Sequence, residues 1–343
     1  MEIQTLNPTA PRQRQRIEAF LKRNGLRFDD MHYYAAVTDD DGEMIAGGGL
    51  KGNVIKCVAV DDAHKGEAIA NTLISHLIAH ANEEGHSNVM LFTKPKNRQL
   101  FESLSFRLLA EAPEAVLMET GIGGINNMVE QLKKIKEEGE VCKENNQECK
   151  KEEKTNLNIT TPQHLNPSPP QPLTTSTPLR GVVVMNCNPF TLGHRYLIEQ
   201  AAKQVERLFV MVVREDCSLF AYAERKAMVE QGVAHLKNVT VIDGSEYAIS
   251  QATFPTYFLK RLDDAADTQM LLDLDLFRRH IAPALGTTVR FVGTELTDRL
   301  TRRYNQLMHE VLADVRETVR LEKDGNAVSA SRVRKAMEQG DMS

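Results

Sequence analysis

Apolar residues in the first 120 positions recur with two different periods. Helical spacing puts Ile17, Phe20 and Leu21 on one side of residues 11–22, and residues 69–81 carry a similar buried stripe. Short apolar runs bounded by turn-forming residues, which are typical of strands, occur at residues 33–37, 43–46, 53–60 and 89–92. This pattern predicts an α/β domain with a mixed sheet over residues 1–120.

The periodic pattern is lost between residues 121 and 179. Residues 130–154 are dense in Lys and Glu, which can support a solvated helix through pairs three or four positions apart. Residues 161–179 contain six prolines, and proline removes a backbone donor and clashes with the preceding turn. We interpret residues 121–179 as a mobile linker; the alternative is a docking segment for a partner.

From residue 180 to residue 343 strand-like and helical segments alternate. Strand-like runs lie at residues 181–185, 208–213, 239–242 and 289–292, and helical spacing is found at residues 194–206, 223–236, 271–281 and 301–311. Alternating strands and helices predict a parallel, doubly wound, Rossmann-like sheet. Such sheets bind nucleotides at the carboxyl ends of their strands.

A candidate nucleotide loop follows the first of these strands. The run Met-Asn-Cys-Asn-Pro-Phe-Thr-Leu-Gly-His occupies residues 185–194 and leads into a helix. Gly193 allows the backbone to approach a phosphate closely, and the helix start directs unpaired N–H groups at an anion. His194 can donate a hydrogen bond to phosphate oxygens as charge builds on them. The alternative is a loop histidine that only caps the helix.

A second candidate loop lies near the end of the chain, at residues 328–334. Ser329 and Ser331 stand at the start of a short amphipathic helix, where hydroxyls commonly act as caps. With Arg332 and Arg334 beside them, the same residues can form a pocket for a polyphosphate. The order of the two loops, one at each end of a βα domain, favours the second interpretation.

Composition narrows the classes of partner. The chain has 343 residues, a net charge of −5 and a charged fraction of 26%, without a basic block, which argues against nucleic acid as the main partner. No apolar run approaches the roughly 20 residues needed to cross a bilayer, and the start of the sequence lacks a signal-peptide core. Five irregularly spaced cysteines predict no disulfide framework. We therefore expect a cytoplasmic enzyme that acts on neither nucleic acid nor membranes.

Several other polar residues have two possible roles. Cys187 lies within the first loop, but we expect it to fill space rather than act as a nucleophile. Glu215 and Asp216 could assist Mg²⁺ or form a solvated loop. Glu295 could contact the nucleotide or make a structural hydrogen bond, and Arg225 could reach phosphate or form a surface salt bridge. The histidines complete no metal shell, so we predict no protein-bound metal.

The two loops resemble those of the HIGH-type nucleotidyltransferase superfamily, in which a T/H-x-G-H loop and a later S-x-S-x-x-R-like loop enclose ATP. The sequences Thr-Leu-Gly-His at 191–194 and Ser-Ala-Ser-Arg at 329–332 occupy these positions. The resemblance implies that an acceptor attacks the α-phosphate directly and that pyrophosphate leaves, with Mg²⁺ neutralising the phosphates.

By this resemblance His194, Arg332 and Thr191 are the candidate catalytic residues. The expected ATP-binding residues are Asn186, Asn188, Pro189, Phe190, Thr191, Gly193, His194, Gly293, Thr294, Glu295, Ser329, Ser331, Arg332 and Arg334.

Further segments of both halves resemble the citrate (pro-3S)-lyase ligases, also called acetate:SH-citrate lyase ligases. They are found at residues 214–220, 252–260, 281–285, 291–295 and 304–305. The resemblance implies an enzyme that makes acetyl-adenylate from acetate and ATP. It would then transfer acetyl to the thiol of the dephospho-CoA-like arm on the acyl carrier subunit of citrate lyase, which activates the lyase.

The N-terminal half resembles the GNAT acetyltransferases. Residues 65–70, Lys-Gly-Glu-Ala-Ile-Ala, lie between a strand and a helix like the GNAT pyrophosphate loop, and residues 97–106 resemble a late GNAT motif. We predict that this domain holds the CoA-like arm; the alternative is a retained scaffold without a ligand. The expected arm-binding residues are Val58, Val60, Lys65, Gly66, Glu67, Ala68, Ile69, Ala70, Asn97 and Phe101.

Three features depart from the ligase pattern, and rival functions remain. The region before the second domain is longer and more proline-rich than expected, Gln251 stands where the family tends to have Arg, and the sequence ends shortly after the second loop. One rival is an adenylyltransferase that joins AMP to a phosphorylated acceptor such as phosphopantetheine or a mononucleotide. The other is a non-catalytic sensor of acyl-CoA and nucleotide. Dependence on acetate separates the ligase from the first rival, and turnover excludes the second.

Overall fold

The structure, a computed structural model, describes residues 2–64, 67–152, 179–214, 218–244, 247, 254–259, 263–295, 298–323 and 326–340. The chain forms two compact units. Unit 1 gathers residues 1–128, 245–281 and 294–313, and unit 2 gathers residues 129–244, 282–293 and 314–343. The later half of the sequence therefore contributes to both units.

Unit 1 contains a seven-stranded mixed sheet of order β1-β2-β3-β4-β5-β7-β6. Of its neighbouring pairs, β4 and β5 run parallel and the others run antiparallel. This confirms the predicted mixed α/β architecture. The strands are β1 (Glu2–Leu6), β2 (Tyr33–Thr38), β3 (Met44–Lys51), β4 (Val54–Val60), β5 (Asn88–Thr93), β6 (Arg107–Ala112) and β7 (Ala115–Gly121).

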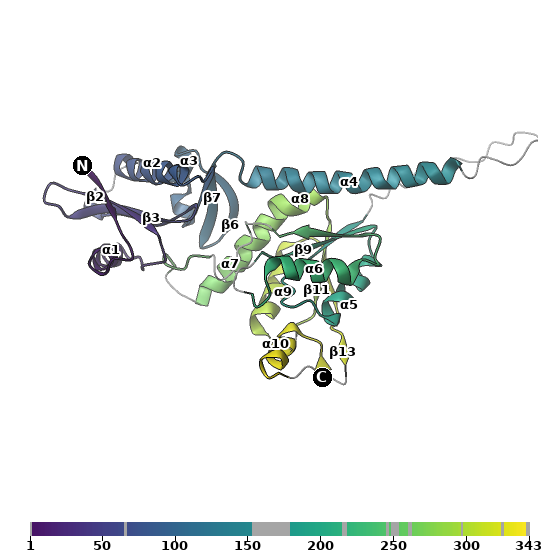
Figure 1. Ribbon diagram of the computed structural model, residues 1–343. Helices are drawn as coiled ribbons and strands as arrows, with labels where there is room; N and C mark the ends of the chain where they lie inside the picture. The colour runs from purple at the N-terminus through teal and green to yellow at the C-terminus, as the bar shows by residue number, and fades with distance from the viewer. Residues whose placement is uncertain are drawn as a thin grey trace, which may run out of the picture. The chain divides into compact units, whose positions relative to one another are not determined.

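The helices of unit 1 pack on the two faces of this sheet (Figure 1). The stripe Leu73, Ile74 and Leu77 of α2 is fully buried against inward residues of the strands, such as Ala35 and Val37. In the first 124 residues the helical segments are α1 (Pro11–Arg23), η1 (Asp62–His64), α2 (Glu67–Glu83), η2 (Pro95–Asn97) and α3 (Arg98–Ser103).

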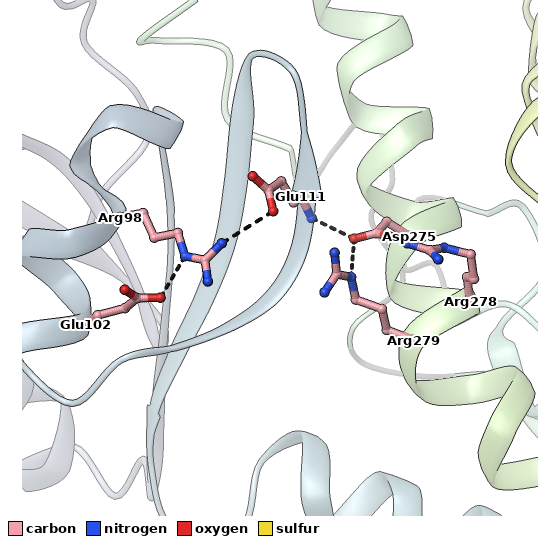
Figure 2. A network of polar contacts seen from close by, with 6 residues as sticks. All are labelled: Arg98, Glu102, Glu111, Asp275, Arg278 and Arg279. Atoms are coloured by element: carbon pink, nitrogen blue, oxygen red, sulfur yellow. Dashed lines mark hydrogen bonds and ion pairs between the residues drawn. The ribbon is translucent and has the colours of Figure 1, made fainter.

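A helix from the later half of the sequence covers the open edge of the unit 1 sheet. Figure 2 shows Asp275 on α7 (Asp263–Leu276) accepting a hydrogen bond of 2.9 Å from the backbone N–H of Glu111 on the edge strand β6. In the π-helical turn η3 (Phe277–Ile281), His280 Nε2 donates to the carbonyl oxygen of Leu109 at 2.9 Å. These contacts pair backbone groups that an open edge strand would expose.

Arginines on both sides of this contact neutralise its acids. Arg278 and Arg279 each approach Asp275 at 2.6 Å, and Arg98 bridges Glu102 and Glu111 on the other side (Figure 2). The Asp275 carboxylate is almost fully buried, whereas the arginines are half-exposed. The ion pairs therefore serve mainly to hold one buried carboxylate on the sheet edge.

Unit 2 contains a five-stranded sheet of order β10-β9-β8-β11-β12, in which every neighbouring pair is parallel. This confirms the predicted parallel sheet. Helices α5 (Leu192–Ala202) and α6 (Tyr222–Val233) cover one face through buried residues such as Ile198 and Val229. The strands are β8 (Arg180–Met185), β9 (Arg207–Val212), β10 (Val239–Asp243), β11 (Val289–Gly293) and β12 (Val315–Thr318).

The charged segment after the first domain forms the long helix α4 (Ile125–Glu152), within the range that we interpreted from the sequence as a mobile linker. The buried Arg207 of unit 2 donates to the carbonyl oxygens of Ile135 and Lys136 on this helix. The prolines of the expected linker lie outside the described residues. The remaining elements are α8 (Ala282–Leu285), α9 (Arg299–Val311), β13 (Glu322–Lys323), β14 (Asn326–Ala327) and α10 (Ala330–Glu338). In the described ranges no helix is both long and apolar enough to cross a membrane.

Candidate functional site

The first candidate loop follows β8, the central strand of the parallel sheet. Strand order reverses on the two sides of β8, so this loop stands at the switch point where open α/β sheets bind ligands. Thr191 is the N-cap of α5, and its side chain accepts from the backbone N–H of His194. The loop therefore ends on a helix N-terminus whose partial positive charge favours an anion.

The imidazole of His194 is held by Thr191. The Thr191 backbone N–H donates to Nδ1 of His194 at 3.1 Å, and Thr191 Oγ1 lies 3.0 Å from the same nitrogen. The ring also stacks on Phe190, with centroids 5.9 Å apart. Burial, together with the positive charge of Arg320, lowers the pKa of His194 to about 4. The ring is thus neutral near pH 7, and because Nδ1 accepts, its proton is on Nε2.

The two candidate loops meet within unit 2. A Cβ added to Gly193 would stand 2.9 Å from the carbonyl oxygen of Val328, which directly precedes the second loop. Arg334 Nη1 donates to the carbonyl oxygen of Asn188 in the first loop. The close approach requires a residue without a side chain at position 193. The structure therefore joins two motifs that are separated by more than 130 positions in the sequence.

The second loop is the N-terminus of helix α10. Ser329 caps this helix by accepting from the backbone N–H of Arg332 at 3.3 Å. Ser331 accepts from Arg334 Nη2 at 3.1 Å, and its side chain is exposed like that of Arg332. The capping role expected for one hydroxyl is thus present, and the arginines stand beside the same helix start. Two helix N-termini, those of α5 and α10, belong to the joined loops.

A fully buried arginine holds the first loop by hydrogen bonds to its backbone and to neighbouring segments. Arg225 on α6 donates to the carbonyl oxygen and to Oδ1 of Asn186, both at 2.6 Å. It also donates to the carbonyl oxygens of Val213 at 2.9 Å and Phe220 at 3.1 Å. Neither role suggested by the sequence, a phosphate contact or a surface salt bridge, fits a side chain that is 0% exposed. Its role is to tie the ends of β8 and β9 together.

The other predicted residues of the first loop have structural partners. Asn188 Oδ1 accepts from the backbone N–H of Phe220 at 3.2 Å, and Pro189 follows a cis peptide bond. Cys187 is buried, and burial raises the pKa of its thiol to about 12, as expected of a space-filling residue rather than a nucleophile. Arg320 was not predicted for the site, because it belongs to neither motif and its proximity to His194 becomes evident only in the fold.

The predicted residues after β11 are divided between the units. Gly293 is the last residue of β11 in unit 2, whereas Thr294 and Glu295 belong to unit 1. Glu295 is buried, and its Oε1 accepts from the backbone N–H of Asp298 at 3.0 Å at the start of α9. The structural hydrogen bond that the sequence left open is therefore present. The described residues hold no group of three or more His, Cys, Asp or Glu that could bind a metal ion; Glu215 and Asp216 lie outside them.

Unit 1 contains a cavity of about 870 Å³. It lies where β4 and β5 part: these strands pair only at Val54–Met90 and Ile55–Leu91, and beyond these pairs Val58 and Thr93 line the cavity. Strands that part in this way turn backbone N–H and C=O groups toward the space between them. The volume is within the roughly 300–1,000 Å³ that is usual for small-molecule sites.

Five of the residues predicted to bind the CoA-like arm line this cavity. They are Val58, Val60, Ala70, Asn97 and Phe101. Ala68 and Ile69 belong to the first turn of α2 and are not among the lining residues. Lys65 and Gly66 lie outside the described residues, as does the side chain of Glu67.

Other lining residues were not assigned to the arm site from the sequence. They come from the end of α1, from the segment after β5 and from the later half of the chain, and include Arg23, Asn24, Lys94, Lys96, Tyr257 and Phe258.

The parallel sheet, with its central loop ending on a Thr-x-Gly-His helix start, defines a nucleotidyltransferase-type domain joined to a GNAT-type unit. Comparison with known proteins finds both types of domain, one in each half of the sequence. The model of the citrate lyase ligase C-terminal domain matches residues 180–343, and that of the acetyltransferase (GNAT) family matches residues 1–106.

Full-length relatives identify the family. A citrate (pro-3S)-lyase ligase of Klebsiella pneumoniae is 37% identical over 335 residues, which are 95% of this chain and 87% of that protein. The Escherichia coli K12 protein of the same name is 36% identical over 337 residues, covering 95% and 85%. The chain belongs to the citrate lyase ligase family. A phosphopantetheine adenylyltransferase of Alkaliphilus oremlandii is 29% identical over 112 residues, or 32% of this chain and 71% of that protein.

Proposed function

We propose that the chain is an ATP-dependent ligase that activates acetate as acetyl-adenylate and transfers acetyl to the prosthetic-group thiol of the citrate lyase acyl carrier subunit. Citrate lyase would thereby be activated. Membership of the ligase family supports the overall reaction. The observation that carries the mechanism is the contact of the Thr191 backbone N–H with Nδ1 of His194, because it leaves Nε2 to carry the proton of the neutral ring.

In the first step a carboxylate oxygen of acetate attacks the α-phosphorus of ATP. A P–O bond to acetate forms, the bond from the α-phosphorus to the bridging oxygen breaks, and pyrophosphate leaves. Acetate arrives ionised, so no base is needed. The protein has to orient two anions and to stabilise the charge that builds on the phosphoryl oxygens.

The residues of the joined loops suit this task. The N-termini of α5 and α10 offer backbone N–H groups, and Arg332 and Arg334 offer charged donors for the triphosphate. His194 Nε2–H is a neutral donor, and no described residue makes a hydrogen bond with Nε2. A neutral donor strengthens its bond as the acceptor oxygen gains charge, so it favours the transition state over the ground state.

Mg²⁺ would enter with the nucleotide. The described residues provide no group of three or more His, Cys, Asp or Glu to hold the ion, and phosphate oxygens are common ligands of Mg²⁺. The ion would neutralise phosphate charge, while the protein side chains position the triphosphate.

In the second step the thiol sulfur of the carrier arm attacks the carbonyl carbon of acetyl-adenylate. A C–S bond forms, the bond from that carbon to the phosphate oxygen breaks, AMP leaves and the thiol proton passes to solvent. The cavity of unit 1 supports a role in holding the arm. Its parted strands offer backbone partners to an amide-bearing chain, and Lys94 and Lys96 line it.

Acetate-dependent exchange of labelled pyrophosphate into ATP, with Mg²⁺ and without carrier, tests the proposal. We expect exchange that needs acetate and that falls roughly 100-fold in His194→Ala, as for a lost transition-state donor. Leu219→Ala, which removes a side chain 59% exposed in the same unit, is the control. Turnover with phosphopantetheine but no exchange with acetate would instead establish the adenylyltransferase function suggested by the shorter relative.

Point variants are better suited than truncation to separate acetyl-adenylate formation from acetyl transfer to the carrier. A chain cut at residue 180 would lose α7, whose Asp275 and His280 pair with the edge strand β6 of unit 1. The same cut would lose Tyr257 and Phe258 from the cavity. Loss of transfer in such a fragment would therefore say little about which residues hold the arm.

A further inference from the structure

The cavity of unit 1 is completed by a short aromatic segment from the later half of the chain, residues 254–259. Tyr257 and Phe258 line the cavity and are 8% and 5% exposed. By sequence order these residues belong to the nucleotidyltransferase half, 75 positions or more after β8 begins at Arg180. The N-terminal half by itself therefore lacks one wall of this cavity.

Aromatic contacts fix this segment against β5. Phe254 packs edge-on against Phe92 of β5, with centroids 5.6 Å apart, and Phe258 packs edge-on against Phe254 at 6.4 Å. Tyr257 and Phe258 are themselves edge-on at 5.2 Å. Such pairs add to the burial of apolar area and restrict ring orientation, so the wall is a preorganised surface.

Hydrogen bonds from the end of the first helical region hold the backbone of the segment. The backbone N–H of Arg27 donates to the carbonyl oxygen of Tyr257 at 3.2 Å, and Arg27 Nη2 donates to that of Thr256 at 2.6 Å. Arg27 follows Leu26, which lines the cavity. The segment is thus attached on both sides of the space, through Arg27 and through Phe92.

The chemistry of the lining favours an elongated ligand that has an apolar part, an amide-bearing part and a negatively charged end. Phe92, Phe101 and Phe258 offer an apolar wall, the parted strands offer backbone amides, and Lys94 and Lys96 provide cations. A thiol arm with an amide-bearing stem and a diphosphate end has these three properties in one chain. Neither a free amino acid nor a simple nucleotide uses all three.

We propose that Tyr257 and Phe258 form the wall against which the amide-bearing stem of the thiol arm binds, so that the arm site is a product of both halves of the sequence. This rests on the proposed function, because it assigns a role within the thiol-transfer step. It makes Phe258 a specificity-determining residue for the arm, with no part in adenylation chemistry.

Calorimetric titration of the full chain with dephospho-CoA tests this assignment. Wild type should bind, and Phe258→Ala should bind at least about tenfold more weakly. Truncating a buried aromatic contact commonly costs about 1.4 kcal/mol or more, and about 1.4 kcal/mol corresponds to a tenfold change in affinity. Phe258→Trp, which adds volume to the wall, should also bind more weakly, because it narrows the cavity. Ile122→Ala, at a side chain 84% exposed in the same unit, should keep the wild-type affinity.

Thermal melting separates misfolding from loss of the wall. Should Phe258→Ala fail to fold, Phe258→Leu can replace it, because it retains an apolar side chain while removing the ring. Weaker binding of dephospho-CoA by folded Phe258→Leu would support the assignment. Unchanged affinity in folded Phe258 variants would overturn the assignment, as would a wild type that shows acetate-dependent exchange but does not bind dephospho-CoA. A wild type without acetate-dependent exchange would instead overturn the proposed ligase function.

Discussion

Thr191 and His194 bind each other at the start of α5, with the Thr191 backbone N–H donating to Nδ1 of His194 at 3.1 Å. This contact performs the helix-capping role that the sequence analysis considered and leaves Nε2 for the proposed phosphate role. Capping uses Nδ1, and the phosphate role requires Nε2. Because a backbone N–H can only donate, the neutral ring carries its proton on Nε2 and is oriented as a donor.

Replacing His194 by amides should separate the two roles of the ring. Asn can accept from the Thr191 N–H near the Nδ1 position but has no donor at the Nε2 position, whereas Gln can extend an N–H toward it. We expect pyrophosphate exchange to fall roughly 100-fold in His194→Asn and His194→Ala, and less in His194→Gln. Initial-rate measurements at saturating ATP and acetate provide the comparison.

Thermal melts of the three variants complete this test. His194→Asn should melt close to wild type, because the cap of α5 is retained. Equal activity of the Asn and Gln variants would show that the distal donor is not used, and would remove His194 from the proposed transition state.

The low pKa of His194 predicts an unusual titration. Burial and Arg320 hold the pKa at about 4, compared with about 6.5 for an unperturbed histidine. An NMR titration of the labelled ring, assigned with His194→Asn, should show its midpoint near 4, and exchange should show no acid limb near pH 6.5. A midpoint near 6.5 would mean that the ring is solvated and can be protonated as readily as a free histidine.

The same shift links His194 to stability. Between pH 6.5 and 4 the unfolded chain binds a proton on this ring that the folded chain does not. The free energy of unfolding should therefore fall as pH decreases through this window, by roughly 3–4 kcal/mol at most from this group. His194→Asn removes this contribution, so its stability should depend less steeply on pH in urea titrations.

The sequence predicts the parallel sheet well because its central strands are buried on both faces. Residues 181–185 and 208–213 are continuous apolar runs and become β8 and β9. Edge strands lack this signal: β1 and β12 consist mostly of exposed or partly exposed residues and were not predicted. Strand β3 was predicted to end at residue 46 but continues to Lys51 through three glycines.

Those glycines show why a local rule fails here. Glycine normally weakens a strand, but a Cβ at Gly49 would stand 2.6 Å from the carbonyl oxygen of Tyr33, and one at Gly47 would meet the Tyr34 ring. The positions are glycine because neighbouring groups fill the space. Such a requirement comes from the tertiary structure and is not visible in a single sequence.

The candidate site was predictable where it is local and not where it is long-range. Loops 185–194 and 328–334 carry compact motifs, and the structure brings them together at Gly193 and Val328. The packing of α7 on β6 through Asp275, and the entry of Phe258 into the cavity of unit 1, involve pairs of segments far apart in the chain. No periodicity or motif encodes these pairs.

Arg225 should be required for the shape of the first loop. Arg225→Lys keeps the charge but loses the forked geometry that serves the carbonyl oxygens of Asn186, Val213 and Phe220. We expect the free energy of unfolding to fall by about 1–3 kcal/mol, because buried acceptors lose their donor. Urea unfolding measures the loss, and exchange activity should fall with it.

A surface arginine in the same unit is the matched control for Arg225. Arg195 is 45% exposed and pairs with Glu199 at 2.8 Å within one helix. Arg195→Ala should change the free energy of unfolding by less than about 0.5 kcal/mol. If Arg225→Lys is as stable as this control, the loop is held by other contacts and Arg225 is not its organiser.

Gly193→Ala should separate activity from stability. A methyl group at this position would stand 2.9 Å from the carbonyl oxygen of Val328, so the loops at 185–194 and 328–334 would have to move apart. Alanine is the better helix former by about 1 kcal/mol, which offsets part of the cost of this clash, so melting should change little. A small displacement of phosphate-binding groups should nevertheless lower exchange about 10- to 100-fold at subsaturating ATP. Leu192→Ala, at a side chain 61% exposed beside Gly193, should leave both properties near wild type. Wild-type exchange in Gly193→Ala would show that the two loops need not be in contact for adenylation.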